Sequence, residues 1–318
     1  MRRKNELSTE ELKIIKDDLS AKSFTLSELI DAFLEDCQLR NLREHTIKYY
    51  RNELRSFKNL IGTENVEEIT AELIKDRIIR KEQEKGNKPV SINSRLRAVR
   101  AFFNFLLEQG YIKKNPMDGV SLLKHRKNVI QTLTVQQINA LLNACNLRTF
   151  VGYRDYVIIS LILETGIRAW ELVNIDVYDV DLSKGFIRIK QSKNHLERVV
   201  PIQKKMKDLL NRYIKIRGNV DTDRLFITID GKPLSKRQLQ QRISDLGEKA
   251  GIKGVRVSPH TLRHTFAKLS VMNGANAFQL QAILGHTTLE MTKVYVNLFS
   301  NDVAESHKKF SPLQNIKR

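Results

Sequence analysis

Residue types that mark several large protein classes are scarce in this chain. Only two of its 318 residues are cysteines, and Cys37 and Cys145 lie in different halves, which excludes a disulfide framework and a cysteine-rich zinc site. No apolar run approaches the roughly 20 residues of a transmembrane helix, and acidic residues rather than an apolar segment follow the basic N-terminus. We therefore expect a cytoplasmic protein with no membrane partner.

Acidic side chains are scarce relative to basic ones. The chain has 55 lysines and arginines against 36 aspartates and glutamates, a formal charge of +19. An excess of this size indicates a polyanionic partner, and nucleic acid is the first expectation. The hydrophobic content of 41% is that of folded domains rather than of a disordered basic tail, and the length suggests two domains.

The two halves of the chain differ in character. Residues 1–128 carry 26 basic and 20 acidic side chains, a charge of +6, whereas residues 129–318 carry 29 and 16, a charge of +13. Apolar residues at three- and four-residue steps predict four helices in the first half. These helices span residues 27–39, 46–60, 70–84 and 91–108.

The helix predicted over residues 91–108 has two faces. The apolar face consists of Ile92, Leu96, Val99, Phe103 and Leu106. The polar face consists of Asn93, Arg97, Arg100 and Asn104. Between residues 88 and 127 only two acids oppose nine basic residues, as expected of a surface that lies against phosphates. We therefore predict that Arg97 and Arg100 bind DNA, although a solvated face has the same pattern.

The second half begins after a predicted linker and mixes helices with a few strands. Residues 112–131 hold Pro116 and Gly119 but no sustained period, which is typical of a linker. Helices are predicted after an N-cap at Thr134 and over 153–164, 235–250, 258–272, 278–284 and 289–298. Segments 185–190 and 197–202 predict a β-hairpin, and residues 224–229 are predicted to add a third strand. The fold class is mainly α with a small antiparallel β-sheet.

Two segments of the second half carry groups suited to phosphate chemistry. Arg168 follows a Thr-Gly turn and has Glu171 three residues later on the same helical face. The carboxylate can hold the guanidinium so that its planar fork meets a phosphate, although an ordinary Arg–Glu helix pair has the same spacing. Lys193 lies at the tip of the hairpin, where a lysine solubilises a turn or delivers a proton, and Lys190 lies close by.

A third segment places His260 and Arg263 on one face at the start of a helix, and a helix N-terminus favours an anion. His260 and His264 have the spacing of a zinc pair. The basic Arg263 between them and the lack of a nearby acid argue against a metal, and we predict no metal or other cofactor.

A fourth segment supplies His286 after a glycine and Tyr295 nine residues later. Tyr295 is a candidate nucleophile, because arginines and a phosphate can promote loss of its proton as it attacks; half-buried packing is the alternative. This basic domain thus combines two arginines, two histidines, a lysine and a tyrosine. The combination indicates metal-free attack on a phosphodiester, in which the arginines neutralise the negative charge that develops on the phosphate.

The phrases TGIRAWEL, HTLRHTFA and LGHTTLEMTKVY resemble, in order and spacing, the boxes of the tyrosine recombinase or phage integrase family, and the resemblance is strongest to its short Xer-like and transposon-borne members. It implies a SAM-like core-binding domain over 24–111 and an α+β catalytic domain over 132–300, with an extension over 1–23 and a tail over 301–318 that packs on a neighbouring protomer. The implied catalytic residues are Arg168, Lys193, His260, Arg263, His286 and Tyr295, supported by Glu171.

The resemblance also implies the reaction and the partners. The two arginines and His286 bind the scissile phosphate, Tyr295 forms a 3′-phosphotyrosine bond and frees a 5′-hydroxyl, Lys193 protonates that oxygen, and His260 assists proton transfer. Neither ATP nor metal is needed. The active form is a homotetramer on two double-stranded DNA duplexes that passes through a Holliday junction in the nucleoid, with room for an accessory or directionality factor.

The DNA contacts and the biological role are predicted less directly. The helix over 235–249 carries Lys236, Arg237 and Arg242 near its start, and we predict that it enters the major groove. The N-terminal extension favours integration or excision of a mobile element. Xer-type resolution of chromosome dimers, a type IB topoisomerase that acts on one duplex, and a DNA-binding regulator without catalysis are the alternatives.

Overall fold

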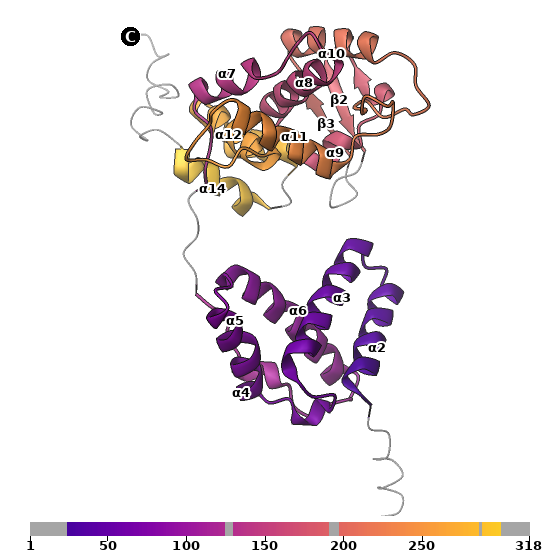
Figure 1. The fold of residues 1–318 in the computed structure, drawn as a ribbon, viewed down its shortest axis with the longest axis vertical. Coiled ribbons are helices and arrows are strands. Elements are labelled where there is room, and N and C mark those ends of the chain that lie inside the picture. Colours follow the sequence, from indigo (N-terminus) through magenta and orange to yellow (C-terminus); the bar gives the residue numbers. More distant parts are fainter. Residues whose placement is uncertain (1–23, 125–129, 191–196, 286–287, 300–318) are drawn as a thin grey trace, which may run out of the picture. The chain divides into compact units, whose positions relative to one another are not determined.

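The structure is a computed structural model that describes residues 24–124, 130–190, 197–285 and 288–299 (Figure 1). The chain divides into two compact units, Met1–Asn128 and Val129–Arg318, and each unit has a hydrophobic core of its own. No helix within the described ranges is long and apolar enough to cross a membrane.

The first unit is built from helices. Its elements are α2 (Leu26–Leu39), α3 (Glu44–Ile61), η1 (Val66–Glu68), α4 (Ala71–Ile74), the π-helical turn η2 (Lys75–Arg80), α5 (Lys81–Glu84), α6 (Pro89–Glu108) and η3 (Pro116–Gly119). Thr25 and Glu28 form a capping box at the start of α2. The four predicted helices are confirmed, the third as α4, η2 and α5 in succession.

The core of the first unit lies where α2, α3 and α6 pack together. The predicted apolar face of α6 is confirmed, because each of its five members is at most 1% exposed. Phe33 of α2 and Phe57 of α3 meet Phe102 and Phe103 of α6 edge to face, with ring centroids 5.8 and 6.0 Å apart. These contacts bury large apolar rings and hold the three helices together.

The polar face of α6 binds part of the protein's own chain. Asn93 exchanges two hydrogen bonds with the backbone of Leu123, and Arg100 Nη2 donates to the Val120 carbonyl oxygen at 2.6 Å. This face is thus partly covered, because the segment after α6 folds back onto it. Arg97 is exposed, and DNA binding by Arg97 and Arg100 stays a prediction.

The first part of the predicted linker over 112–131 packs on the first unit, so the linker is shorter than we expected. Asn115 begins η3 and donates from Nδ2 to Asn104 Oδ1 at 2.7 Å. Met117 and Val120 are only 2% and 3% exposed and belong to the first core. A short turn such as η3 can bury two apolar side chains without any helical period. The packing of this segment therefore could not be predicted from periodicity alone.

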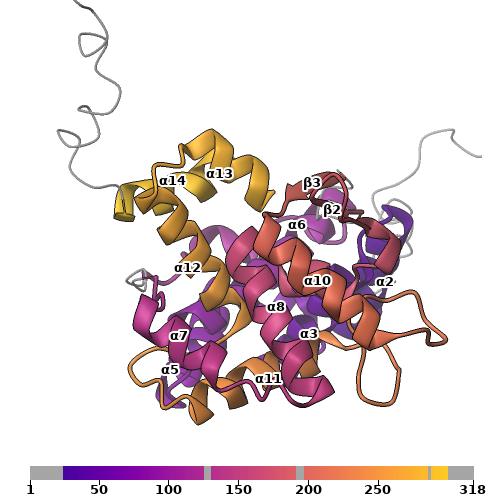
Figure 2. The same cartoon turned by 90° about the horizontal axis from the view of Figure 1, so that it is seen from above.

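The second unit places a small sheet beside a group of helices. Its elements are α7 (Val135–Asn143), α8 (Phe150–Thr165), α9 (Ala169–Val173), η4 (Val177–Asp179), β1 (Val180–Asp181), β2 (Phe186–Ile189), β3 (Arg198–Pro201), α10 (Lys204–Arg217), α11 (Lys236–Lys249), α12 (Pro259–Met272), α13 (Ala277–Leu284) and α14 (Leu289–Phe299). α8 is the central helix, because it packs against α7, α10, α11 and α12. Figure 2 shows α8 and α10 side by side.

The sheet is antiparallel in the order β1-β2-β3, and it confirms the predicted hairpin. Ile187 pairs with Val200, and both are 1% exposed. Alternate residues therefore pack on the core, whereas Arg188 and Val199 on the other face are exposed.

Two features of the second unit differ from the sequence analysis. Residues 224–229 form no strand, because their backbone bonds go to separate segments: Leu225 donates to Ile175, and Phe226 accepts from Leu234. The third strand is β1 instead. Helix α10 was missed, although Met206, Leu210 and Tyr213 lie four and seven residues apart along it and are buried.

Candidate active site

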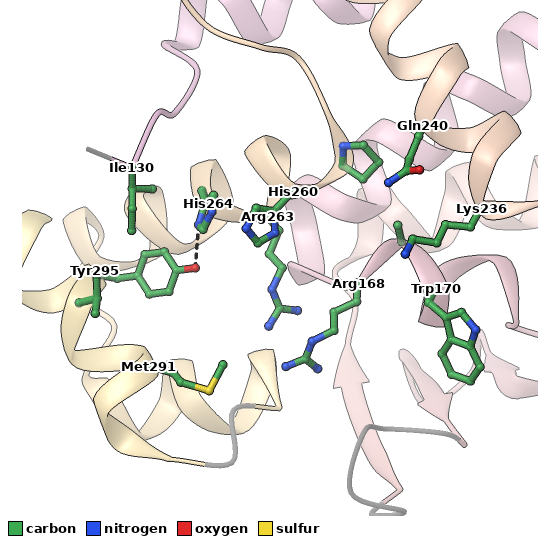
Figure 3. Close-up of a pocket in the computed structure, with 13 residues that line it drawn as sticks. Ile130, Arg168, Trp170, Lys236, Gln240, His260, Arg263, His264, Met291 and Tyr295 are labelled. Carbon is green, nitrogen blue, oxygen red and sulfur yellow. Dashed lines mark hydrogen bonds between the residues drawn. The ribbon is translucent and has the colours of Figure 1, made fainter. Parts of the chain in front are cut away.

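A cavity of about 620 Å³ opens in the second unit between α9, α11, α12 and α14 (Figure 3). Four of the six predicted catalytic residues line it together, namely Arg168, His260, Arg263 and Tyr295. They come from the turn before α9 and from two other helices, so the fold brings together side chains that are far apart in the sequence.

The turn between α8 and α9 positions Arg168. Helix α8 ends at Gly166, whose φ of 61° is left-handed, and a Cβ atom there would lie 2.3 Å from Cδ1 of Phe266, so the position requires glycine. The backbone N–H of Arg168 then donates to the Glu171 carboxylate at 3.0 Å. This contact fixes the start of α9 and directs the Arg168 side chain, which is 31% exposed, into the cavity.

Glu171 is a buried carboxylate between two arginines. Arg168 Nη1 donates to its Oε1 at 2.9 Å, and Arg198 of β3 donates to both carboxylate oxygens at 2.8 and 2.7 Å. Burial raises the pKa of Glu171, but the hydrogen bond and charge of Arg198, followed by those of Arg168, outweigh it and lower the pKa below its ordinary value. Glu171 is therefore ionised at neutral pH, and the three groups together carry a charge of +1.

Arg263 adds a second surplus positive charge. Its side chain is buried, and its Nη1 and Nη2 donate to the carbonyl oxygens of Gly166 at 2.6 Å and Leu284 at 2.9 Å. Burial, followed by the charge of Arg168, lowers the pKa of Arg263 to about 9, so the guanidinium stays protonated at neutral pH. Its five N–H donors are not exhausted by these two bonds, which orient it.

The C-terminal end of α13 is held by three arginines, which we call the arginine cluster. The donor and acceptor pairs are Arg198 with the Ile283 carbonyl at 3.1 Å, Arg263 with Leu284 at 2.9 Å and Arg168 with Gly285 at 2.9 Å. The last carbonyls of a helix have no intrahelical partner and carry partial negative charge, so cations stabilise them. Gly285 is left-handed with a φ of 62°, and a Cβ atom there would lie 2.8 Å from Arg198 Nη1.

Tyr295 and two histidines form the other side of the cavity. The Tyr295 hydroxyl lies 2.7 Å from Nδ1 of His264 (Figure 3), and burial raises the pKa of Tyr295 although Arg263 and Arg168 oppose this. The ring of His260 lies edge-on to that of His264, with centroids 4.1 Å apart. Burial, then Arg263 and Arg168, lower the pKa of His260, and burial, then His260 and Arg263, lower that of His264 to about 4.

Two predicted catalytic residues, Lys193 and His286, lie outside the described residues. Lys190, which lies three residues before Lys193 in the sequence, lines a different cavity of about 230 Å³. Its Nζ lies 2.7 Å from Asp179 Oδ1 and 3.9 Å from the ring centroid of Tyr178. Within the ranges that the structure describes, no three His, Cys, Asp or Glu side chains gather as they would around a metal ion.

The predicted DNA contacts on α11 have different surroundings. Lys236 is exposed and lines the 620 Å³ cavity, and Arg237 is exposed beside it. Arg242 instead donates from Nε and Nη2 to Asp155 Oδ2 at 2.9 and 2.8 Å. It therefore fastens α11 to the buried Asp155 of α8.

Two residues of this site, Arg198 and His264, were not predicted from the sequence. Arg198 lies two residues before the buried Val200 on β3, so strand alternation places both on the same face. His264 lies four residues after His260 on α12, hence on the same helical face. We weighed His264 only as a zinc ligand, whereas its ring contacts Tyr295.

Each of the two units matches a known protein family. The family "Phage integrase, N-terminal SAM-like domain" matches residues 30–110, and the "Phage integrase family" matches residues 131–302. Tyrosine recombinase XerC of Thermodesulfovibrio yellowstonii is 32% identical over 280 residues, 85% of this chain and 91% of the relative. Tyrosine recombinase XerD of Staphylococcus epidermidis is 29% identical over 90% of this chain and 99% of its own length.

Two solved structures share the fold at lower identity. A lambda integrase dimer bound to a COC′ core site has a TM-score of 0.76 at 19% identity, over 92% of this chain and 81% of that one. The Tn1549 transposon integrase in complex with a circular intermediate DNA has a TM-score of 0.74 at 21% identity, over 92% and 100%.

Proposed function

The chain belongs to the phage integrase family, and from this premise we propose that it is a site-specific DNA recombinase, which cleaves and rejoins strands through a covalent bond to Tyr295. One observation carries the proposal: the Tyr295 hydroxyl and the guanidinium groups of Arg168 and Arg263 share one cavity in the more basic half of the chain. The relatives named as tyrosine recombinases, aligned over most of their length, support it.

The arginines bind the phosphate that is cut. In Figure 3 the guanidinium ends of Arg168 and Arg263 point toward the same part of the cavity, where they can hold the two non-bridging oxygens. Negative charge grows on these oxygens in the transition state, and a fixed donor there is worth about 3 kcal/mol in catalysis. Glu171 and the carbonyls of α13 keep both guanidiniums in place before DNA arrives.

The strand is cut by substitution at phosphorus. The Tyr295 oxygen forms a bond to phosphorus, the bond to the 5′ oxygen breaks, and a 3′-phosphotyrosine and a 5′-hydroxyl result. In this proposal Lys193 protonates the leaving oxygen, His286 donates to the phosphate and His260 assists proton transfer. Because the new bond is again a phosphodiester, a second 5′-hydroxyl can reverse the step without ATP.

Recombination requires two duplexes, so we infer a tetramer whose C-terminal tail, residues 301–318, packs on a neighbouring protomer. A lambda integrase tetramer bound to a Holliday junction, with a TM-score of 0.74 at 19% identity, has the same fold. Removing all residues after Leu298 should leave DNA binding intact and abolish the pairing of two duplexes. Retained recombination by the truncated protein would show that the tail is not an assembly element.

For the biological role, we favour integration or excision of a mobile element in the cytoplasmic nucleoid. The first 23 residues precede the SAM-like match, which begins at residue 30, and offer a site for an accessory or directionality factor. The two roles are distinguished by sequencing the fragments of genomic DNA that the bound protein protects from digestion. Protected sites at the ends of an element support the role, whereas one site near the chromosome terminus indicates dimer resolution.

The activity is tested with a suicide version of the protected site, nicked so that cleavage cannot be reversed. Wild-type protein should form a covalent protein–DNA adduct, and Tyr295→Phe should form none while still binding the DNA. If the wild-type protein forms no adduct, the recombinase function is wrong and the alternative of a DNA-binding regulator without catalysis is favoured. Joining of two duplexes separates a recombinase from a type IB topoisomerase, which would relax one.

A further inference from the structure

The contact between His264 and Tyr295 is built into the fold of the second unit. The ring of Tyr295 packs with Phe266, Leu280 and Leu284 in a small core, so its hydroxyl cannot turn freely. That hydroxyl lies 2.7 Å from Nδ1 of His264, within the range of a strong hydrogen bond. Both side chains line the cavity that holds Arg168 and Arg263.

His264 has the protonation state that a proton acceptor needs. Among the described residues, the charged and titratable groups that share the cavity with His264 are His260 and Arg263 on α12, Tyr295 on α14, Lys236 on α11 and Arg168. Burial, followed by the neighbouring His260 and the positive charge of Arg263, lowers the pKa of His264 to about 4, so at neutral pH the ring is neutral. With the proton on Nε2, Nδ1 offers its lone pair to the tyrosine O–H. An entering phosphate is negative and therefore makes His264 more basic when DNA is bound.

His260 is less well placed for this proton. Its ring contacts that of His264 rather than the tyrosine ring, whereas the rings of His264 and Tyr295 are 5.5 Å apart, with the hydroxyl directed at Nδ1. The two histidines thus form a row from the tyrosine toward the start of α12.

We propose that His264 is the general base for Tyr295, an inference that rests on the recombinase function proposed above. As the tyrosine oxygen bonds to phosphorus, its proton moves to Nδ1 and His264 becomes an imidazolium. The electrons of the breaking P–O bond go to the 5′ oxygen, which takes a proton from the general acid. In religation a 5′-hydroxyl attacks phosphorus and gives its proton to the conjugate base of that acid, while the tyrosine leaves and recovers its own proton from Nδ1.

Two substitutions separate proton transfer from positioning. In His264→Asn an amide oxygen replaces Nδ1, so it can still accept the hydrogen bond but is not basic, whereas His264→Phe can do neither. We expect both to cut the suicide substrate about 10²- to 10⁴-fold more slowly than wild type in a single turnover. If the histidine only positions Tyr295, His264→Asn should cleave within about threefold of wild type, a result that overturns the proposal.

The pH dependence gives a second readout that a structural defect would not produce. Without a base, attack requires prior ionisation of the phenol, whose ordinary pKa is about 10. The ratio of the His264→Asn rate to the wild-type rate should therefore rise roughly tenfold per unit between about pH 7 and pH 9. His260→Asn should be slower than wild type without this rise. A constant ratio for His264→Asn would contradict the proposal.

The failure of this inference can be told apart from failure of the proposed function. If wild-type protein forms no adduct, the recombinase function itself fails. If wild type forms the adduct and His264→Asn matches it, only the role of His264 fails. DNA binding in gel retardation and the thermal unfolding of each variant, both expected to match wild type, show that the loss is in chemistry.

Discussion

Arginines contact carboxylates in both units, but the charges balance in the cluster around Arg95 of the first unit and do not balance in the arginine cluster of the second. In the first unit Arg95 lies 2.8 Å from Glu82 and 3.3 Å from Glu53, and Lys85 also pairs with Glu82, so two cations face two anions. Among the described residues of the second unit, the arginine cluster has one carboxylate, Glu171, within hydrogen-bonding distance. The remaining positive charge faces a cavity.

The difference separates a structural cluster from a binding site. Buried charge is costly unless it is paired, and the balanced group around Arg95 joins α6 to α3 and α5 with no surplus. The arginine cluster instead holds uncompensated charge beside Tyr295, the proposed nucleophile, and is partly stabilised by the carbonyls at the end of α13. A phosphate would supply the missing negative charge, so the surplus itself indicates the ligand.

The largest expected effect comes from removing the one carboxylate of the unbalanced cluster. Glu171→Gln leaves the guanidiniums of Arg198 and Arg168, which are 11% and 31% exposed, without a counter-charge and should lower the free energy of unfolding of the second unit by about 3–5 kcal/mol. The matched change Glu53→Gln leaves Arg95 paired with Glu82 and should cost about 1 kcal/mol or less. Denaturant unfolding of both variants measures these free energies. Equal losses of stability would show that the two clusters do not differ in charge balance as described.

The same carboxylate should make the second unit sensitive to acid. Because folding lowers the pKa of Glu171, its stabilising contribution is complete above the unfolded pKa of about 4.3 and is lost as the pH falls through the folded value. Unfolding free energies measured from about pH 6 down to pH 3 should converge for wild type and Glu171→Gln. Parallel curves would mean that Glu171 is not the ionised partner of Arg168 and Arg198.

Arg242 and Lys236 test the same distinction on one helix. Arg242→Ala removes two charge-assisted bonds from the buried Asp155 and should cost about 1.5–3 kcal/mol of stability. Lys236→Ala should leave stability within about 0.5 kcal/mol but reduce the salt dependence of DNA binding by about one phosphate contact. Thermal unfolding measures the stability of both variants, and a salt titration measures their binding to DNA. If Lys236→Ala lowered stability and left the salt dependence of binding unchanged, the major-groove role of Lys236 would be wrong.

Arg198 should have a smaller effect, exerted through other residues. Arg198→Lys keeps the charge but cannot bind both oxygens of Glu171 and the Ile283 carbonyl at once. We expect cleavage about tenfold slower, with DNA affinity unchanged, because Arg198 is not among the residues that line the cavity. Arg188→Lys, on the exposed face of β2, is the control and should cleave like wild type.

Much of this fold could be predicted from the sequence, because helical periods mark the buried faces of α2, α3, α6 and α8. The pairing of Arg168 with Glu171 followed from their spacing on one helix. Arg198 comes from a strand 27 residues after Glu171, and no local period reports that encounter. The polar face of α6 was ambiguous for the same reason, since a pattern cannot tell whether phosphates or the returning chain will cover it.

The central claim is that the surplus charge neutralises the scissile phosphate, and one substrate tests it most directly. A methylphosphonate at the cleavage site removes the charge of one non-bridging oxygen. Arg168→Ala should cut the normal diester about 10²- to 10³-fold more slowly than wild type and should recover most of that loss on the methylphosphonate. An equal defect on both substrates would show that Arg168 does not act by neutralising the phosphate.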